Sequence, residues 1–197
     1  MVFFIINKWK RYIPYGDINI NMNKAGLKKL ALVIPSSIIF FLIVPGISVI
    51  FGKRLDKALG LNPINPSSLG LVLATALLVI GGYYVLESIR ILFIEGKGIP
   101  LGDLLPEEQT TELITTGIYS QTRNPMVFGY LFCLITLGIY LNSWSIAVAV
   151  PLLYITIWTI WLKAHEEPAL EERFGDTYKK YREKTPYLVP RPWKRIK

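Results

Sequence analysis

Four apolar segments, separated by short polar ones, dominate the pattern of the chain. They cover residues 30–51, 69–94, 126–141 and 144–162. About 20 helical residues span the ~30 Å hydrocarbon core of a bilayer, so segments of this length and composition predict membrane helices. Only Asn142 and Ser143 separate the last two segments. That connection is too short for anything but an antiparallel helical hairpin.

Prolines and glycines punctuate these helices. Pro35 and Pro45 predict bends in the first segment, and the Gly81-Gly82 pair predicts a close contact or a bend in the second. Proline disfavours helix at the residue that precedes it, so Pro168 predicts a break or kink at the end of the fourth helix.

The charged tail beyond the fourth segment has its own pattern. Residues 169–174 predict a short helix that Gly175 closes. Tyr178 and Tyr181, three residues apart, would share one face of a second short helix, and extended chain follows from Thr185. We therefore expect a lid over the membrane surface, with its aromatic rings turned toward the mouth of the hairpin.

Composition and charge place the chain in the membrane class. Of its 197 residues, 52% are hydrophobic and 18% charged, against about 25% charged in an ordinary soluble domain. Six lysines and arginines precede residue 30, three lie at 53–57 and ten follow residue 162. Such clusters flank the apolar segments and do not form a nucleic-acid footprint, so no nucleic-acid partner is expected. An even number of spans with basic ends predicts both termini in the cytoplasm, near anionic lipid.

Together these patterns predict an all-α integral membrane protein. It would have four transmembrane helices, or five if residues 1–29 add one. Residues 1–29 are interpreted as a basic, aromatic interfacial arm, 30–94 as two membrane helices, and 95–197 as a cytoplasmic loop, the membrane hairpin 126–162 and the lid. One cysteine and one histidine offer no disulfide and no metal-ligand spacing, so no metal is expected.

Two polar clusters stand at one end of the hairpin. Arg123-Asn124-Pro125-Met126 precedes the third apolar segment, and His165-Glu166-Glu167-Pro168 follows the fourth. Because the hairpin makes one round trip, both clusters should meet at the same membrane surface. Charged groups at such a place are costly, which makes them functional-site candidates.

The two clusters belong to longer motifs. The first runs from Gly117 to Met126, with Gly129 beyond, and the second continues from Glu166-Glu167-Pro168 through Leu170, Phe174-Gly175, Tyr178 and Tyr181 to Val189-Pro190-Arg191. These motifs resemble the signature of the isoprenylcysteine carboxyl methyltransferase family and its phospholipid methyltransferase relatives. The resemblance covers about residues 95–192 and makes 95–197 the methyltransferase core. It implies an integral membrane enzyme that takes a methyl group from S-adenosylmethionine. Asn124 stands where the family commonly has histidine.

The chemistry of that cofactor suits the clusters. A sulfonium cation with an amino-acid end, a ribose and an adenine calls for carboxylates, a fixed cation and aromatic walls. The residues predicted to bind the cofactor are Tyr119, Arg123, Asn124, Pro125, Met126, Gly129, His165, Glu166, Glu167, Tyr178 and Tyr181. Arg123 and Glu167 are also the predicted catalytic residues. Arg123 would orient an anionic acceptor, and Glu167 would act as base if the acceptor must lose a proton.

Other interpretations remain open at this point. Arg123 could be a positively charged flank of a membrane helix, the two glutamates a solvated helix end, and His165 an interfacial ring. The chain could instead be an NADPH-dependent reductase of the sterol and steroid type, although the loop before Arg123 has only Lys97 to meet the extra phosphate. It could also be a non-catalytic assembly partner. The methyl acceptor, a prenylated cysteine or another lipid-like molecule that enters from the bilayer, is not specified by the residues.

Overall fold

Helices form the regular structure of the part of the chain that can be described. The computed structural model describes residues 38–94 and 112–191, which contain no strand. The interfacial arm expected at 1–29 lies outside the described residues, as do Pro35 and most of the long polar loop. The helical elements in chain order are η1 (Ile39–Ile43), α3 (Val44–Ala58), α4 (Ser68–Ile94), η4 (Gly117–Ser120), α5 (Pro125–Tyr140), η5 (Ser145–Ala149), α6 (Val150–Trp161), η6 (Leu162–Glu166) and α7 (Glu167–Lys184).

Within the described residues, the apolar segments predicted from the sequence are helical. α4 and α5 each begin one residue before the predicted segment. The first segment continues as helix beyond residue 51 to Ala58, through its basic residues. Two helices, Ser68–Leu92 and Ser145–Lys184, are long and apolar enough to cross a membrane, and Pro125–Tyr140 is apolar but shorter.

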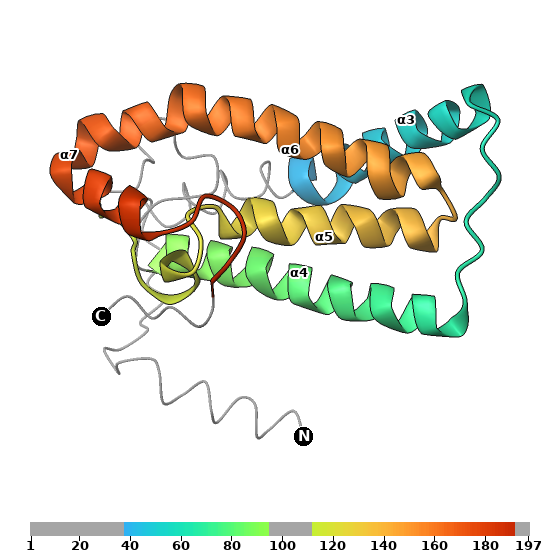
Figure 1. Cartoon of the computed structure of the whole chain (residues 1–197), viewed down its shortest axis with the longest axis horizontal. Helices are drawn as coiled ribbons and strands as arrows, with labels where there is room; N and C mark the ends of the chain where they lie inside the picture. Colours follow the sequence, from blue (N-terminus) through green and yellow to red (C-terminus); the bar gives the residue numbers. More distant parts are fainter. Residues whose placement is uncertain (1–37, 95–111, 192–197) are drawn as a thin grey trace, which may run out of the picture. The chain divides into compact units, whose positions relative to one another are not determined.

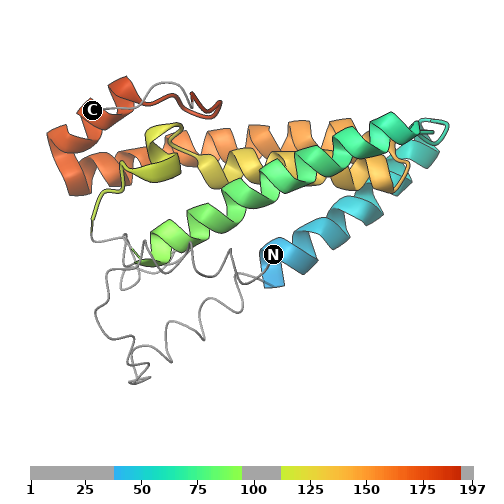
Figure 2. The ribbon, with the colours of Figure 1, turned by 90° about the horizontal axis from the view of Figure 1, so that it is seen from below.

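The glycine pair predicted to allow close approach does so through one of its members. α4 and α5 run along each other (Figures 1 and 2). A Cβ on Gly81 would lie 2.6 Å from the main-chain oxygen of Gly129, and a Cβ on Gly129 would lie 2.5 Å from that of Gly81. Gly82 has nothing within 4 Å of its own virtual Cβ. The crossing of α4 and α5 therefore requires Gly81 and Gly129, but not Gly82.

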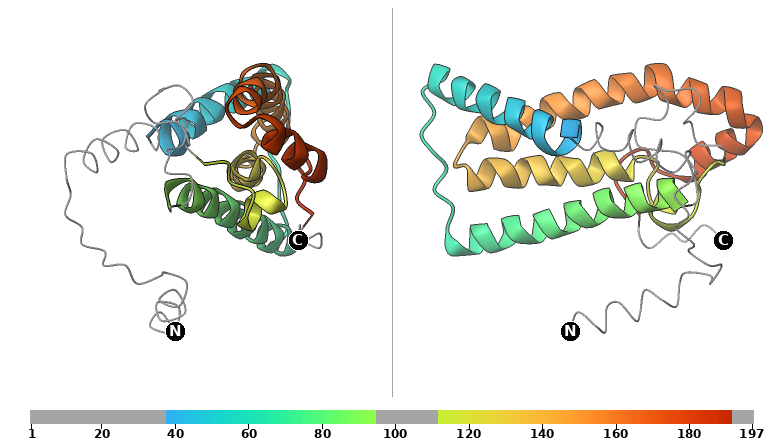
Figure 3. Two further views of the ribbon diagram at one scale, coloured as in Figure 1. Left: turned by 90° about the vertical axis from the view of Figure 1, so that its left-hand side faces the viewer. Right: turned by 180° about the vertical axis from the view of Figure 1, so that it is seen from behind.

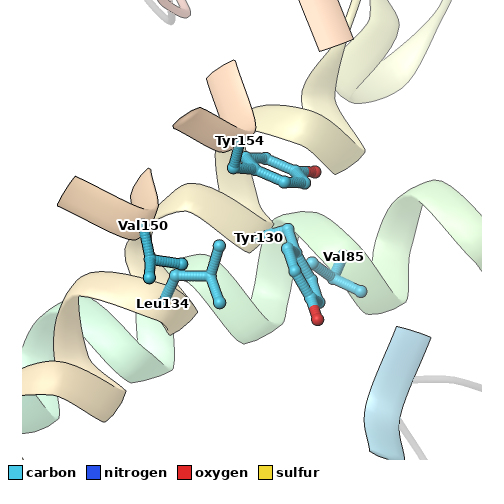
Figure 4. Close-up of a cluster of buried hydrophobic side chains, with 5 residues drawn as sticks. All are labelled: Val85, Tyr130, Leu134, Val150 and Tyr154. Carbon is cyan, nitrogen blue, oxygen red and sulfur yellow. The ribbon is translucent and has the colours of Figure 1, made fainter. Parts of the chain in front are cut away.

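The core lies where α4, α5 and α6 meet. Val85, Tyr130, Leu134, Val150 and Tyr154 form one buried cluster (Figure 4). The rings of Tyr130 and Tyr154 have centroids 5.2 Å apart. This cluster joins α4 to both helices of the hairpin, α5 and α6. The predicted hairpin is thus confirmed.

At the end remote from the two polar clusters, α3 is bonded to the hairpin turn (Figure 3). The Asp56 carboxylate accepts hydrogen bonds from the Ser143 hydroxyl and, at 2.8 Å, from the Ser145 main-chain N–H. Asn142 takes the left-handed conformation that the tight turn requires, with φ 53°. Asp56 therefore caps the helix that returns toward the polar clusters.

Within residues 38–94 and 112–191, three π turns interrupt the helices, each ending two residues before a proline. The prolines are Pro45, Pro151 and Pro168. In each turn the residue before the proline donates its N–H five residues back: Val44 to Ile39, Val150 to Ser145 and Glu167 to Leu162. Proline has no N–H and pushes against the preceding turn, and a wider turn relieves both problems.

Of the break or kink predicted at Pro168, the break does not occur. Glu167 stays helical, with φ −60° and ψ −44°, and the chain continues from α6 through η6 into α7. A widened turn accommodates the proline without ending the helix.

The predicted end of a helix at Gly175 is confirmed. Gly175 has φ 53° and ψ −131°, a conformation that favours glycine, and α7 bends sharply there (Figure 1). An Arg182–Glu171 ion pair of 2.8 Å holds the second half of α7 against the first.

Candidate functional site

Arg123 and Glu167 form an ion pair between the segment before α5 and the start of α7. The bond joins Nη1 of Arg123 to Oε1 of Glu167, and the side chains are only 13% and 17% exposed. Because the hairpin of α5 and α6 returns to its starting end, it brings the two polar clusters of the sequence together. Charges this poorly solvated are costly to hold unless they are paired, which explains why each needs the other.

The chain after α7 docks against the segment that precedes α5. We call residues 185–191 the strap. Hydrogen bonds of 2.8–3.0 Å fix it: Arg123 N–H to the Pro186 carbonyl, Asn124 Nδ2 to the Tyr187 carbonyl, Thr122 Oγ1 to the Leu188 carbonyl, and Arg191 N–H to the Gln121 carbonyl. Thr122 is fully buried under it. The strap thus forms part of the surroundings of Arg123, although 63 residues separate Asn124 from Tyr187.

Tyr187 of the strap lies against two cations. The Arg123 guanidinium carbon is 5.4 Å from the centre of its ring and Lys163 Nζ is 5.5 Å from it. Contacts of this kind are worth on the order of 0.5–2 kcal/mol, more where water is excluded. The Tyr187 ring therefore holds the Arg123 guanidinium on one side, while Glu167 binds its Nη1.

The tyrosines of α7 turn inward, as predicted. Tyr178 is 2% and Tyr181 8% exposed. The Tyr181 hydroxyl donates to the main-chain carbonyl of Tyr119 at 2.7 Å, which joins the second half of α7 to η4. Burial raises the pKa of Tyr119, Tyr178 and Tyr181 above the usual range of a phenol. All three side chains are thus neutral hydrogen-bonding groups at physiological pH.

Three buried polar atoms of this region have no hydrogen-bond partner among the described residues. They are Arg123 Nε, Thr185 Oγ1 and the Tyr187 hydroxyl oxygen. A buried donor or acceptor left unsatisfied costs about 1–3 kcal/mol. Such groups are rare in folded proteins, so their gathering around Arg123 and the strap marks this region as a candidate ligand site.

A pocket of about 330 Å³ opens beside the ion pair. Its lining residues are Lys163, Glu167, Pro168, Glu171, Glu172 and Arg182. The volume lies within the range of small-molecule sites, roughly 300–1,000 Å³. Its lining includes both acidic and basic side chains, which suits a ligand that carries both signs of charge.

The first polar cluster mainly begins α5. Asn124 occupies the N-cap position, but its side chain makes no capping bond and instead donates to Tyr187. Pro125 is buried at the first helical turn, and Met126 follows it there. Gly129 is buried at the crossing with α4, so packing alone accounts for a glycine at that position.

His165 and Glu166 differ in their placement. His165 is exposed, lies against the Trp161 ring in a tilted arrangement with 4.5 Å between ring centroids, and does not line the pocket. This geometry favours the interfacial interpretation of the ring. The charge of Glu166, by contrast, adds to the effect of burial in raising the pKa of Tyr119 and Tyr178. Glu166 therefore belongs to the electrostatic surroundings of the site.

Several residues of the region were not singled out by sequence reasoning. They are Thr122, Lys163, Glu171, Arg182, Thr185 and Tyr187. The Val189-Pro190-Arg191 motif was the one signal that the strap matters. No helical period or charge pattern indicates where a non-helical segment docks. Among the described residues, no group of His, Cys, Asp or Glu could hold a metal ion.

The sequence was compared with models of known protein families and with curated proteins. The family model described as phospholipid methyltransferase matches residues 69–177, more than half of the chain. No curated protein matches the chain significantly. The matched stretch runs from α4 into α7 and includes Arg123 and Glu167, whereas Tyr187 lies beyond it.

Proposed function

The chain belongs to the phospholipid methyltransferase family, and we propose that it transfers a methyl group from S-adenosylmethionine to a lipophilic acceptor at a membrane surface. One observation carries the proposal. The half-buried Arg123–Glu167 pair stands beside a pocket and beside three buried polar atoms that no described residue satisfies. The family match supports neither the reductase nor the non-catalytic alternative.

The residues present fit S-adenosylmethionine. Its amino-acid end carries an ammonium and a carboxylate, for which Glu167 and Arg123 are the matching partners, already held together. Arg123 Nε can donate a hydrogen bond, and the Tyr187 hydroxyl can donate or accept one. Both would bind the amino-acid end of the cofactor or its ribose. Tyr119, Tyr178 and Tyr181 would supply neutral aromatic walls, with Glu166 adding negative charge. Asn124, Pro125 and Met126 would shape the entry to α5 beneath them.

The main contribution of the protein would be to position the acceptor in line with the methyl group. When bound, S-adenosylmethionine supplies a methyl group whose bond to sulfur breaks as a lone pair of the acceptor attacks from the opposite side. The strap and α7 would exclude water, and Arg123 would hold an anionic acceptor in line. Glu167 would accept the proton of an amine or alcohol acceptor, whereas a carboxylate needs no base. The carboxylate of a prenylated cysteine and other lipid-like acceptors are both consistent with this arrangement.

The proposal includes a topology. η1–α3, α4, α5 and the η5–α6–η6 run would be four membrane helices, with the site and both termini in the cytoplasm. α7 and the strap would then be the cytoplasmic lid, and residues 95–197 the methyltransferase core. Basic residues in the tail and the short polar turn at Asn142 support this orientation. Labelling of single cysteines in a Cys133→Ser background would test it: a cysteine at Glu183 should react from the cytoplasmic side and one at Asn142 from the opposite side.

Calorimetric binding of S-adenosylhomocysteine to the detergent-purified protein tests the function. We expect binding by the wild type and at least tenfold weaker binding by Glu167→Gln, because an amide cannot hold both Arg123 and an ammonium. Glu183→Gln, an exposed glutamate of α7 outside the pocket, is the matched control and should bind as the wild type does. Binding of NADPH but not S-adenosylhomocysteine would overturn the proposal.

A further inference from the structure

η6 is the π turn that places Glu167, and a proline stands directly behind it. The turn covers Leu162–Glu166, Glu167 donates its N–H five residues back to Leu162, and Pro168 follows. Both flanks of this turn contribute to the site, since Lys163 contacts Tyr187 and Glu167 pairs with Arg123. The geometry of the turn therefore decides whether these two residues reach their partners.

The same arrangement occurs twice elsewhere in the helices, away from the site. η1 precedes Pro45 and η5 precedes Pro151, each with the same spacing. In the π register the carbonyl of Phe40 would pair with residue 45, which has no N–H. The Tyr130 hydroxyl donates to this carbonyl instead, at 2.6 Å. Proline is thus the common cause of the three turns, and a freed carbonyl is the common result.

A π turn holds one more residue than an α turn. An α-helix advances about 100° per residue, so the extra residue sets the rotation of everything that follows relative to what precedes it. Without the widened turn, Glu167 would face about 100° away from its present direction, or α7 would lose its contacts with η4 and the strap. At η6 the corresponding carbonyl is that of Lys163, a residue that lines the pocket.

We propose that Pro168 is a positioning residue of the methyltransferase: by enforcing the π turn Leu162–Glu166, it rotates Glu167 toward Arg123 and completes the cofactor site. The proposal rests on the proposed function. Pro168 need not touch the reacting atoms for this role. Pro168 would act by setting the rotation of α7 relative to the helix before the turn. Its effect can therefore be distinguished from that of a residue that contacts the ligand.

Three variants test the proposal by calorimetric binding of S-adenosylhomocysteine to the full chain in detergent. Pro168→Ala restores an N–H and allows the α register, so we expect affinity to fall on the order of 10- to 100-fold, as for small misplacements in sites of this kind. Pro45→Ala and Pro151→Ala remove the prolines of the other two π turns, and they should keep wild-type affinity. Thermal unfolding of all three gives the general cost of losing such a turn.

A compensating deletion distinguishes a changed rotation of α7 from a general loss of structure. Ala164 is an exposed residue inside η6. Removing it from the Pro168→Ala variant converts the π turn to an α turn while keeping the rotation of α7 unchanged. We expect the double variant to recover affinity to within about threefold of the wild type, an allowance that corresponds to less than 1 kcal/mol.

Each outcome is decisive. Wild-type affinity of Pro168→Ala, an equal loss in Pro45→Ala or Pro151→Ala, or no recovery in the double variant would overturn the proposal. If Pro168→Ala does not fold, the double variant decides alone, and its failure to bind has the same meaning. A wild type that does not bind would instead contradict the proposed cofactor. Hydrogen exchange over residues 160–170 would then still test the turn, since Pro168→Ala should change it and Pro45→Ala should not.

Discussion

The guanidinium of Arg123 pairs with the carboxylate of Glu167, although 44 residues of chain separate them. The pair forms because Arg123 stands just before α5 and Glu167 directly after η6, at the same end of the hairpin. Arg123 is also held by the Tyr187 ring and by the strap, so its position is fixed from three directions. The predictions below follow from this arrangement and from the packing that supports it.

Arg123→Lys should impair cofactor binding nearly as much as Arg123→Ala. Lysine keeps the positive charge, but it has neither the planar fork that reaches Glu167 nor a second donor beside it. We expect at least tenfold weaker binding of S-adenosylhomocysteine in both variants. The neighbouring cation Lys163, replaced by arginine, is the control and should keep its contact with the Tyr187 ring. Near wild-type affinity of Arg123→Lys would show that only the charge of Arg123 is needed.

Tyr187→Phe should separate ligand binding from stability. The hydroxyl is buried without a partner among the described residues, so its removal should leave the free energy of unfolding unchanged or raise it by up to about 1–3 kcal/mol. The ring remains, and with it the contacts to both cations. If the hydroxyl serves the cofactor, S-adenosylhomocysteine should raise the melting temperature less in the variant than in the wild type. An equal rise in both proteins would remove the hydroxyl from the site.

Gly81→Ala and Gly82→Ala should differ sharply in stability. The Cβ added at Gly81 would lie 2.6 Å from the Gly129 oxygen and 2.9 Å from Cβ of Phe132, and so α4 and α5 must separate. Overpacking of this kind costs roughly 1–3 kcal/mol. At Gly82 nothing lies within 4 Å, and alanine should be neutral or stabilising by up to about 1 kcal/mol. Thermal unfolding in one detergent compares the two, and equal melting temperatures would contradict the crossing.

Alkaline pH should loosen the docking of α7 onto η4. Burial raises the pKa of Tyr181 above its ordinary value of 10.0. A group whose pKa is higher in the folded than in the unfolded protein stabilises the fold below its unfolded pKa, and this contribution is lost as the pH rises beyond it. We therefore expect stability to fall above about pH 10. Tyr181→Phe should reduce that fall while losing about 0.5–1.5 kcal/mol at neutral pH, because its bond to Tyr119 is gone.

The measurement is the melting temperature between pH 8 and 11, with tyrosinate absorbance as a second signal. Tyr83→Phe is the matched control, because Tyr83 is 56% exposed on α4. An alkaline slope that is the same in Tyr181→Phe and in the wild type would assign the loss of stability to other groups.

The features that the sequence predicted correctly are the long apolar helices and the turns and interruptions between them. Long apolar runs predicted α4 and α5 to within a residue, the short Asn142-Ser143 connection predicted the hairpin, and Gly175 predicted the interruption of α7. The meeting of Arg123 and Glu167 followed from the hairpin alone. These predictions depend only on local properties of a few adjacent residues.

Features that depend on distant partners were not predictable in this way. The helix continues through a π turn at Pro168 and does not break there, and α7 then reaches η4, where the Tyr181 hydroxyl bonds to Tyr119. Asp56 has no motif around it, yet it caps the hairpin from another helix. Tyr187 lies in a segment without period, so its place between two cations could not be inferred.

The strap also sets an order of events during synthesis. Thr122, Arg123 and Asn124 leave the ribosome about sixty residues before the carbonyls that they bond. Until residues 186–191 have been made, these donors have no strap to bind and Arg123 has no Tyr187 ring beside it. A nascent chain can therefore have α3 to α6 assembled and still have no complete place for a ligand. A ligand site that includes the strap would therefore form in one step, once residues 186–191 have been made.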